Sequence, residues 1–436
     1  MMKKFILGIL ITIFMFFGTS CMGNTDQNFV LKPAGAKYSY NYTDAQDEGY
    51  INFINKLESF YAKLSANTYT TFKDETDNMC ISPVSIYMAL ALTIECSDNN
   101  TRQEILNAIG VTYEEVKQYT KLIYSQLNNE YLVDGTVSCI ELLTNSIWFE
   151  ESIELKEIGL TSLADNYNCS SYGVPFKNNN GAANKALQDY VNKNTKGLIN
   201  NSFNLPVDTL LALVNTFYLK EVWDIEDDLV FTKEKYNFTN YDKTTKETKL
   251  LQGYYYPGQV YKTDMFEHFY TKTAHGYKVS FIVPNDEYSI DDIYTKDILE
   301  EILGMEDYKS VDKDAKKEYV TRCLFPEFEA SFKQDIKDIL KDQMGINELF
   351  SDDCNFTNIT DEDDICCGKV VHQTKLMVDK TGMEGAAVTI VAMGPTSAGP
   401  GGYEKVSQDF IIDRDFVFVI GDNNGNIVFT GVIKNI

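Results

Sequence analysis

The chain has 436 residues, a formal net charge of −25 and 44% hydrophobic residues. Its acidity argues against nucleic-acid binding, which requires a basic surface, and suits solubility or the weak steering of basic partners. The length is sufficient for one large domain or two ordinary ones. Because no repeat, linker or second shift of composition appears after residue 50, we expect a single domain over residues 49–436.

The N-terminus has the features of a targeting segment. Lys3 and Lys4 precede an apolar run over residues 5–17, and small residues follow, as in a signal peptide. The run is short for a membrane span, which needs about 20 residues. We therefore expect a signal peptide at residues 1–20 and a polar tether at residues 21–48.

The end of this segment resembles a bacterial lipobox. Residues 18–21 are Gly-Thr-Ser-Cys, and in a lipobox Cys21 would be lipidated and become the mature N-terminus. The leucine that usually stands upstream is absent, and Phe17 lies nearby instead. The resemblance implies an exported cell-envelope lipoprotein, with plain secretion as the alternative.

The chain contains nine cysteines, of which eight remain when Cys21 is set aside. An even number in an exported protein allows disulfides, but there is no Cys-x-x-Cys pair and several cysteines lie inside apolar runs. We therefore expect buried thiols. His268, His275 and His372 do not cluster with cysteines in sequence, so we expect no metal site. The eight are Cys80, Cys96, Cys139, Cys169, Cys323, Cys354 and the adjacent Cys366 and Cys367.

The expected domain begins with three predicted helices. Residues 50–64 carry apolar side chains at helical spacing. Pro83 stands where the start of a helix favours proline, ahead of an apolar helix over residues 87–94. The spacing of Thr101 and Glu104 is that of a capping box and predicts the start of a third helix.

A helix and a strand follow in the middle of the chain. Leu187 and Tyr190 share one face of a helix expected within residues 183–199. Residues 210–220 form a long apolar run, typical of a strand buried on both faces. The polar Asn215 inside this run must find hydrogen-bond partners, because an unpaired buried amide is costly.

The last third of the chain is predicted to be rich in strands. We expect a strand at residues 325–328, a helix over residues 336–344, and a strand over residues 372–378 whose alternate side chains face a core. The C-terminus predicts a strand over residues 410–420, an Asn-Gly hairpin turn, and a strand over residues 427–433.

One segment before the C-terminal strands combines two contrary tendencies. Residues 384–393, EGAAVTIVAM, have strong β-propensity, but glycine- and proline-rich residues typical of loops follow at once. Gly382 marks a hinge ahead of them, because glycine admits backbone angles that other residues resist. The segment is either a core strand before an ordinary turn or a stored conformational change, and the pattern alone favours the ordinary strand.

Six of these segments, in the same order, resemble the motifs of the serpin family of protease inhibitors. The resemblance implies an α+β fold with a large mixed central sheet, two further sheets, about eight or nine helices, and an exposed reactive-centre loop at about residues 382–409. Insertion of this loop into a sheet is an established example of strand addition in serpins. The six motifs lie at residues 78–86, 183–199, 210–223, 324–350, 369–392 and 410–433.

The resemblance also implies roles for buried residues. Four polar side chains would meet beneath the central sheet as a latch, called the shutter, that breaks and reforms as the sheet parts. Trp223 would belong to the breach, the end of the sheet where the loop enters. The four shutter residues are Ser82, Ser85, Asn215 and His372.

The family spacing places the reactive bond between Thr396 and Ser397, with Met393 and Ala398 as alternatives. The hinge has the small residues that insertion requires, although Met383 and Gly385 depart from the family pattern. The hinge residues are Gly382, Met383, Glu384, Gly385, Ala386, Ala387 and Thr389.

The function implied by the resemblance is a one-use covalent trap for endopeptidases. Elastase-like or subtilisin-like serine proteases fit best, because no Lys or Arg lies near the expected bond. Papain-like cysteine proteases, or a non-inhibitory binding role, are the alternatives. The chain has no Gly-x-Ser-x-Gly motif, so we expect no enzyme, no cofactor, and a monomer whose partner is the target protease.

Overall fold

The computed structural model describes residues 29–35, 46–75, 77–133, 136–200, 202–223, 229–305, 311–362, 365, 367, 369–384 and 404–436. The expected signal peptide with Cys21, and the reactive-centre loop from Gly385 to residue 403, lie outside these residues. Within them, no helix is long and apolar enough to cross a membrane.

The central sheet has eight strands in the order β1-β5-β4-β6-β18-β17-β16, with β3 paired to β4. It is mixed, since β4 runs parallel to β5 and antiparallel to β6. Its strands are β1 (Val30–Lys32), β3 (Glu130–Val133), β4 (Thr136–Glu150), β5 (Cys169–Val174), β6 (Leu211–Val222), β16 (Phe328–Asp335), β17 (Val371–Val378) and β18 (Gly382–Met383).

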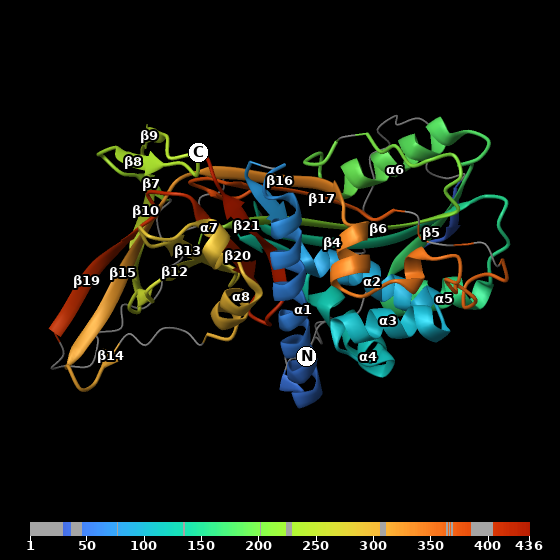
Figure 1. Cartoon of the computed structure of the whole chain (residues 1–436), viewed down its shortest axis with the longest axis horizontal. Helices are drawn as coiled ribbons and strands as arrows, with labels where there is room; N and C mark the ends of the chain where they lie inside the picture. Colours follow the sequence, from blue (N-terminus) through green and yellow to red (C-terminus); the bar gives the residue numbers. More distant parts are fainter. Residues whose placement is uncertain are drawn as a thin grey trace, which may run out of the picture.

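Two further sheets and a hairpin form the other end of the molecule (Figure 1). The six-stranded sheet holds β2 (Met79–Ile81), β11 (Tyr261–Lys262), β12 (Phe266–Lys272), β13 (Lys278–Pro284), β20 (Phe416–Gly421) and β21 (Ile427–Ile433). The five-stranded sheet holds β7 (Val230–Phe231), β10 (Leu251–Pro257), β14 (Val311–Asp312), β15 (Lys317–Phe325) and β19 (Glu404–Ile411), and the hairpin is β8 (Tyr236–Thr239) with β9 (Thr245–Thr248).

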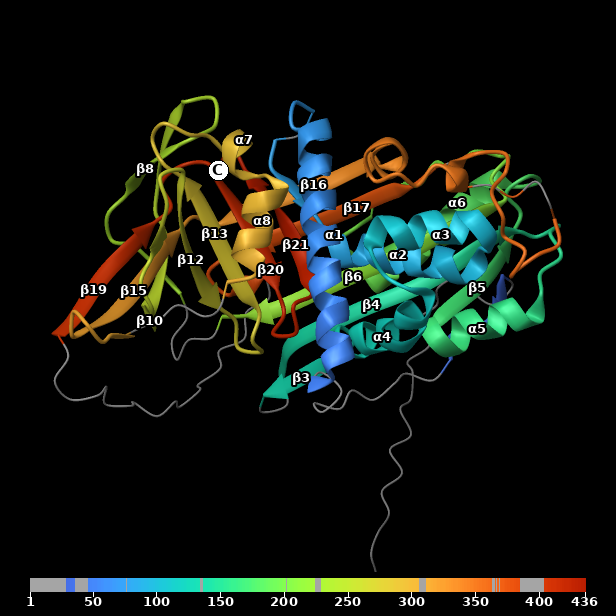
Figure 2. The ribbon, with the colours of Figure 1, turned by 60° about the horizontal axis from the view of Figure 1, so that its bottom comes forward.

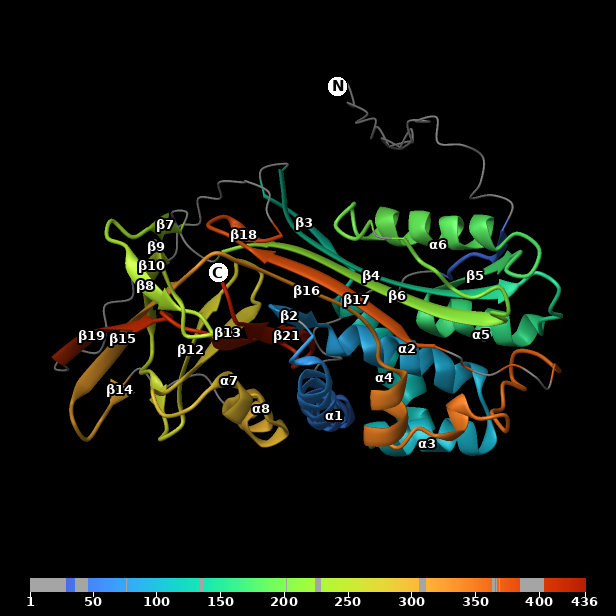
Figure 3. The same ribbon diagram turned by 45° about the horizontal axis from the view of Figure 1, so that its top comes forward.

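Helices cover both faces of the central sheet. Figure 3 shows α6 on one face and α2 to α5 on the other, and Figure 2 shows α1 between this helical group and α8. The helices are α1 (Glu48–Phe72), α2 (Pro83–Cys96), α3 (Asn99–Ile109), α4 (Tyr113–Gln126), α5 (Glu157–Tyr167), α6 (Asn180–Asn194), α7 (Ile290–Ile293) and α8 (Lys296–Leu303), with a π-helix at Ile339–Gln343 and a 3₁₀-helix at Glu348–Phe350.

The start of the third helix was predicted wrongly. α3 begins at Asn99, and Thr101 is fully buried inside it, where its hydroxyl accepts a hydrogen bond from Asn355 N at 2.9 Å. Glu104 accepts bonds from two backbone N–H groups near residue 347 instead of capping its own helix. Tertiary partners thus replace the local capping contacts.

Strand breaks also differ from the prediction at two places. The expected strand at residues 325–328 is the break between β15 and β16, and the expected strand at residues 410–420 is interrupted between β19 and β20. In both cases the two strands belong to different sheets. The alternation over residues 372–378 is confirmed, because His372, Thr374, Leu376 and Val378 are all buried.

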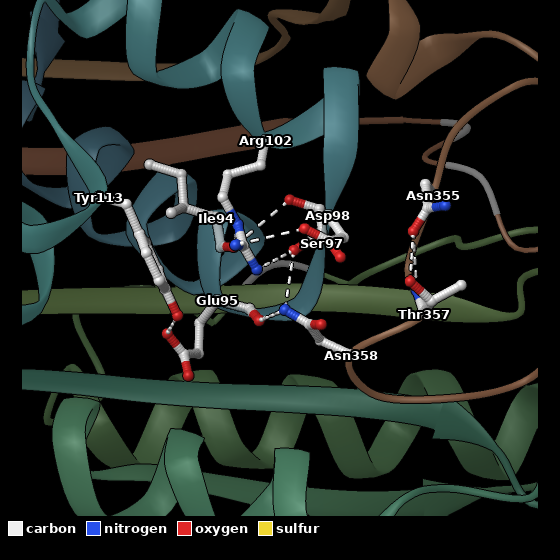
Figure 4. Close-up of polar contacts among 9 residues, drawn as sticks. All are labelled: Ile94, Glu95, Ser97, Asp98, Arg102, Tyr113, Asn355, Thr357 and Asn358. Carbon is white, nitrogen blue, oxygen red and sulfur yellow. Dashed lines mark hydrogen bonds and ion pairs between the residues drawn. The ribbon is translucent and has the colours of Figure 1, made fainter.

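The C-terminal end of α2 is held by a dense polar cluster (Figure 4). The Arg102 side chain donates to the carbonyls of Ile94, at 3.1 Å, and Ser97, at 2.5 Å. Asn358 donates to the carbonyls of Glu95, at 3.2 Å, and Ser97, at 3.0 Å. These bonds satisfy carbonyls that every helix end leaves open, so this end of α2 is fixed.

The cysteines are mostly buried thiols, with one exception. Cys354 is bonded in a disulfide, which corrects the expectation of thiols throughout. The free cysteines of the described part of the chain are Cys80, Cys96, Cys139, Cys169, Cys323 and Cys367.

Candidate functional site: a slot in the central sheet

The two middle strands of the central sheet face each other across an incomplete ladder. β6 forms ten residue pairs with β4, and β17 forms eight with β16. Between β6 and β17, only β18 is inserted, and its two residues pair with Val222, Glu221 and Val378. Just after β18, Glu384 N donates to the Met377 carbonyl at 2.6 Å. Beyond that bond, among the described residues, no strand pairs with residues 211–220 of β6 or residues 371–376 of β17 on this side. The sheet therefore has an open slot between two unpaired strand edges.

A cavity lies at the far end of this slot from β18. It has a volume of about 130 Å³ and is lined by residues of α2, β6 and β17. The strand residues that line it include 211–217 of β6 and 371–374 of β17, which are the unpaired stretches. The gap between β6 and β17 therefore contains a cavity at this point.

The four predicted shutter residues all line this cavity, but they form two separate pairs. The Ser85 hydroxyl donates a short hydrogen bond to Asn215 Oδ1. The backbone N–H of Ser82 donates to His372 Nε2 at 3.1 Å, whereas the Ser82 hydroxyl is buried with no hydrogen-bond partner. The structure therefore brings the four residues together without joining them in one network.

Asn215 is fully engaged on the closed side of β6. Its amide nitrogen donates to Asn145 Oδ1 at 2.8 Å and to the Thr144 carbonyl at 3.2 Å, both on β4. Sequence analysis missed Asn145, although it too is a polar residue inside an apolar strand. A polar residue within an apolar strand is the pattern that selected Asn215, and the same pattern would have selected Asn145.

His372 is held in its neutral form. Burial lowers the pKa of its imidazole from 6.5 to about 3, because a buried charge loses its hydration. Its Nε2 accepts a bond from the backbone of α2, not from a serine hydroxyl. The imidazole therefore lacks the hydrogen bond to a serine hydroxyl that a catalytic triad requires.

The hinge residues that the structure describes are seated at the breach. Trp223 is buried, and its Nε1 donates to the Asp379 carbonyl at 2.8 Å, just before the hinge. Gly382 has a φ of +154°, and a Cβ there would meet the Glu221 carbonyl at 1.9 Å. Glycine is therefore required for β18 to approach β6 so closely.

The next two hinge residues have opposite environments. Met383 is fully buried. The carboxylate of Glu384, which is part-buried, accepts a hydrogen bond from the Tyr218 hydroxyl at 2.7 Å, a contact that the sequence did not reveal. The remaining hinge residues and the expected reactive bond, Thr396–Ser397, lie outside the described residues.

Comparisons with known proteins agree with this architecture. Residues 59–436 match the family model described as Serpin (serine protease inhibitor). Human neuroserpin is 26% identical over an alignment of 394 positions that covers 87% of this chain and 91% of that protein. Horse alpha-1-antiproteinase 2 is 25% identical over 404 residues, covering 89% and 90%.

Solved structures show the same fold. The thermophilic serpin tengpin in its native state aligns with a TM-score of 0.71 at 21% identity, over 93% of this chain and 97% of that one. Human thyroxine-binding globulin, complexed with thyroxine, aligns with a TM-score of 0.69 at 20% identity, over 88% and 99%.

The chain belongs to the serpin family. Serpins are protease inhibitors that form covalent complexes with their target proteases, and they are not enzymes. The expected α+β serpin fold, with a large mixed sheet and further sheets beside it, is confirmed. We therefore base the proposed activity of this chain on the slot beside β18.

Proposed function

We propose that this chain is a covalent-trapping inhibitor of endopeptidases that works by inserting its cleaved loop into the slot. The observation that carries the proposal is that β18 already occupies the first two positions between β6 and β17. The rest of the loop follows β18 directly in sequence. Insertion would continue a pairing that has begun, with Glu384 changing from its left-handed backbone conformation, φ +79°, to an extended one.

The register of β18 fixes where each later residue would fall. Met383 pairs with Val378 on β17 and with Glu221 on β6, both antiparallel. One step forward along the loop is one step back along each neighbour, so Thr389, six residues on, falls opposite 378 − 6 = 372 and 221 − 6 = 215. Thr389 would thus lie level with His372 and Asn215, in the cavity.

The same register decides which side chains turn inward. Met383 faces the core, so alternate residues after it, Gly385, Ala387 and Thr389, would face the core as well. These side chains are small, as a cavity of about 130 Å³ requires. The new strand would bond to both edges, and at about 1 kcal/mol per net hydrogen bond the gain is on the order of 10 kcal/mol. The native state is then held by a kinetic barrier.

The proposed reaction begins as ordinary proteolysis. The nucleophile of the protease attacks the carbonyl carbon of Thr396, the bond to Ser397 breaks, and the amino group of Ser397 leaves with a proton. The carbonyl of Thr396 stays esterified to the protease. Insertion of residues 382 to about 394 would then carry the protease along the sheet and distort its active site before water hydrolyses the ester.

The loop sequence supports a particular class of target. Residues 385–403 contain no Lys or Arg, which disfavours trypsin-like proteases. Thr396 is small and β-branched and follows Pro395, which suits the shallow apolar pockets of elastase-like or subtilisin-like serine proteases. Met393 and Ala398 are the alternative cut positions, and papain-like cysteine proteases are the alternative target class.

We also propose that the chain acts outside the cytoplasm. The basic and apolar residues of segment 1–20 support removal of a signal peptide, and Cys21 would then carry a lipid that anchors the chain to the cell envelope. The expected tether at residues 21–48 is too long, because residues 30–32 within it form β1 and pair with β5 in the central sheet. Labelling of the expressed protein with a radioactive fatty acid would test this. A Cys21→Ser variant is expected to lose the label, and a label that persists would contradict the assignment.

The inhibitor proposal is tested by mixing the purified chain with elastase-, subtilisin- and papain-like proteases. Denaturing gels are expected to show a stable complex of protease and cleaved chain, and mass spectrometry a released peptide that begins at Ser397. Clean cleavage with the protease still active would overturn inhibition and favour a non-inhibitory binding serpin.

A further inference from the structure

Three side chains that can bind a metal ion meet beside the hinge. Cys139 of β4, Glu221 of β6 and His275, in the turn between β12 and β13, place a sulfur, a carboxylate oxygen and a ring nitrogen within 4.8 Å of one another. Cys139 and Glu221 are buried, while His275 is partly exposed. The three come from distant parts of the sequence, which is why the sequence predicted no metal site.

Glu221 has an unused ligand atom that points to a missing partner. Its Oε1 accepts from Val222 N at 2.9 Å and pairs with His275 Nδ1 at 2.9 Å. Its Oε2 is buried with no hydrogen-bond partner, although only 1% of the residue is exposed. An unsatisfied buried carboxylate oxygen is costly, and a bound cation would remove that cost.

His275 is already held as a metal ligand would be. Its Nε2 lies 3.3 Å from the hydroxyl of Ser138, and its ring stacks on Tyr131 with the centroids 4.7 Å apart. Histidines that bind metals usually engage their second ring nitrogen in such an outer contact, which fixes the ring. The contact with Ser138 leaves Nδ1 directed at Glu221, as a ligand atom.

We propose that Cys139, Glu221 and His275 form a binding site for Zn²⁺ or a similar borderline-soft divalent ion. Sulfur, imidazole nitrogen and carboxylate oxygen are the ligands zinc takes, with bonds of about 2.0–2.3 Å, and the thiolate selects against Mg²⁺ and Ca²⁺. On binding, the thiol of Cys139 releases its proton to solvent. Thiolate and carboxylate then balance the charge of the ion, and a water completes the tetrahedron.

The site would connect two sheets where the loop enters. Cys139 and Glu221 belong to the central sheet and His275 to a turn of the six-stranded sheet, and the backbone of Glu221 pairs with Met383. A bound ion would tie the end of β6 to the body of the protein at the breach. This inference stands apart from protease inhibition, because binding can be measured with no protease present.

Cobalt is the probe for the experiment, since a thiolate bound to Co²⁺ gives a charge-transfer band in the near ultraviolet. The purified chain, stripped with a chelator and reduced, is titrated with Co²⁺ and then with Zn²⁺. We expect one equivalent to bind, the thiolate band to appear, and Zn²⁺ to remove it. Absence of the band at one equivalent would overturn the site and leave a His275–Glu221 ion pair.

Variants assign the ligands. Cys139→Ser is expected to abolish the band, whereas Cys169→Ser, which changes another buried thiol of the same sheet, should keep it. Because Cys139→Ser alters a buried position, His275→Ala at the partly exposed turn serves as the second variant. It should weaken Co²⁺ binding by more than about tenfold, the loss that even outer-shell changes cause. Equal affinity in wild type and His275→Ala would contradict the assignment.

Discussion

The two edges of β6 differ sharply in how much of their backbone is paired among the described residues. On the β4 side, ten residue pairs run from Lys220 to Leu211 without a break. On the β17 side, the ladder stops after the two residues of β18, and a cavity follows. Among the described residues, β6 is thus paired along most of its length on one side and only at its end on the other.

Under the proposed function, the open edge is where the fold would store free energy. Unpaired strand edges normally attract further strands, and proteins protect them. Here the two edges of the slot are kept apart in the middle of the largest sheet, over the polar pairs Ser85–Asn215 and Ser82–His372. The closed edge stabilises the sheet, and under the proposed function the open edge accepts the cleaved loop once.

The largest expected effect comes from blocking the open edge. Ala387→Pro places a residue without an N–H donor in the inserting strand, and we expect covalent complexes with the target protease to be lost while cleavage continues. Ala387→Ser, which keeps the small size and the donor, is the matched control and should still inhibit. Covalent complexes formed by Ala387→Pro would show that insertion past residue 387 is not needed.

A second change acts on Asn215, which joins β6 to Ser85 of α2 and to β4. Asn215→Ala leaves the buried groups of Ser85 and Asn145 without their partner, so we expect the free energy of unfolding to fall by about 2–4 kcal/mol. The midpoint of urea unfolding measures this. Asn107→Ala, at an exposed helix position, should change it by less than about 0.5 kcal/mol; equal effects of the two variants would rule out the shutter contact.

Lowering the pH should reduce the free energy of unfolding through His372, which lines the slot. The unfolded histidine takes up a proton below its ordinary pKa of 6.5, but the folded one only below about 3. Between these values the unfolded state binds more protons, so stability falls with falling pH by up to about 1.4 kcal/mol per pH unit. His372→Gln should reduce this slope between pH 6 and pH 4, as followed by urea unfolding. An unchanged slope would mean that His372 is not kept neutral.

The smallest effect is expected at the described end of the hinge. Tyr218→Phe removes the hydroxyl that binds the Glu384 carboxylate at 2.7 Å, and the unfolding free energy should fall by about 0.5–1.5 kcal/mol. Tyr288→Phe, at a tyrosine in the turn before α7, provides a comparison on which the account predicts a smaller change. A loss for Tyr218→Phe no larger than that for Tyr288→Phe would mean that the hinge contact contributes nothing.

The sequence predicted the elements whose patterns are local. The alternation of β17 and the apolar face of α1 follow from period alone, and the family motifs supplied the fold class with its large mixed sheet. It did not predict the two separate pairs beneath the sheet, because which of Ser82 and Ser85 reaches His372 depends on how α2 is seated. Nor did it predict the cluster of Cys139, Glu221 and His275, which only the packing of two sheets brings together.

The central claim is that the slot receives the loop, and the thermal stability of the loop-cleaved chain tests it most directly. The chain is cut once within residues 385–403 by a protease that it does not trap, and its unfolding temperature is compared with that of the intact chain. Because the inserted strand adds on the order of 10 kcal/mol of backbone hydrogen bonding, we predict a rise of roughly 10 °C or more. An unchanged or lower unfolding temperature would mean that the slot stays empty after cleavage, and would contradict the account.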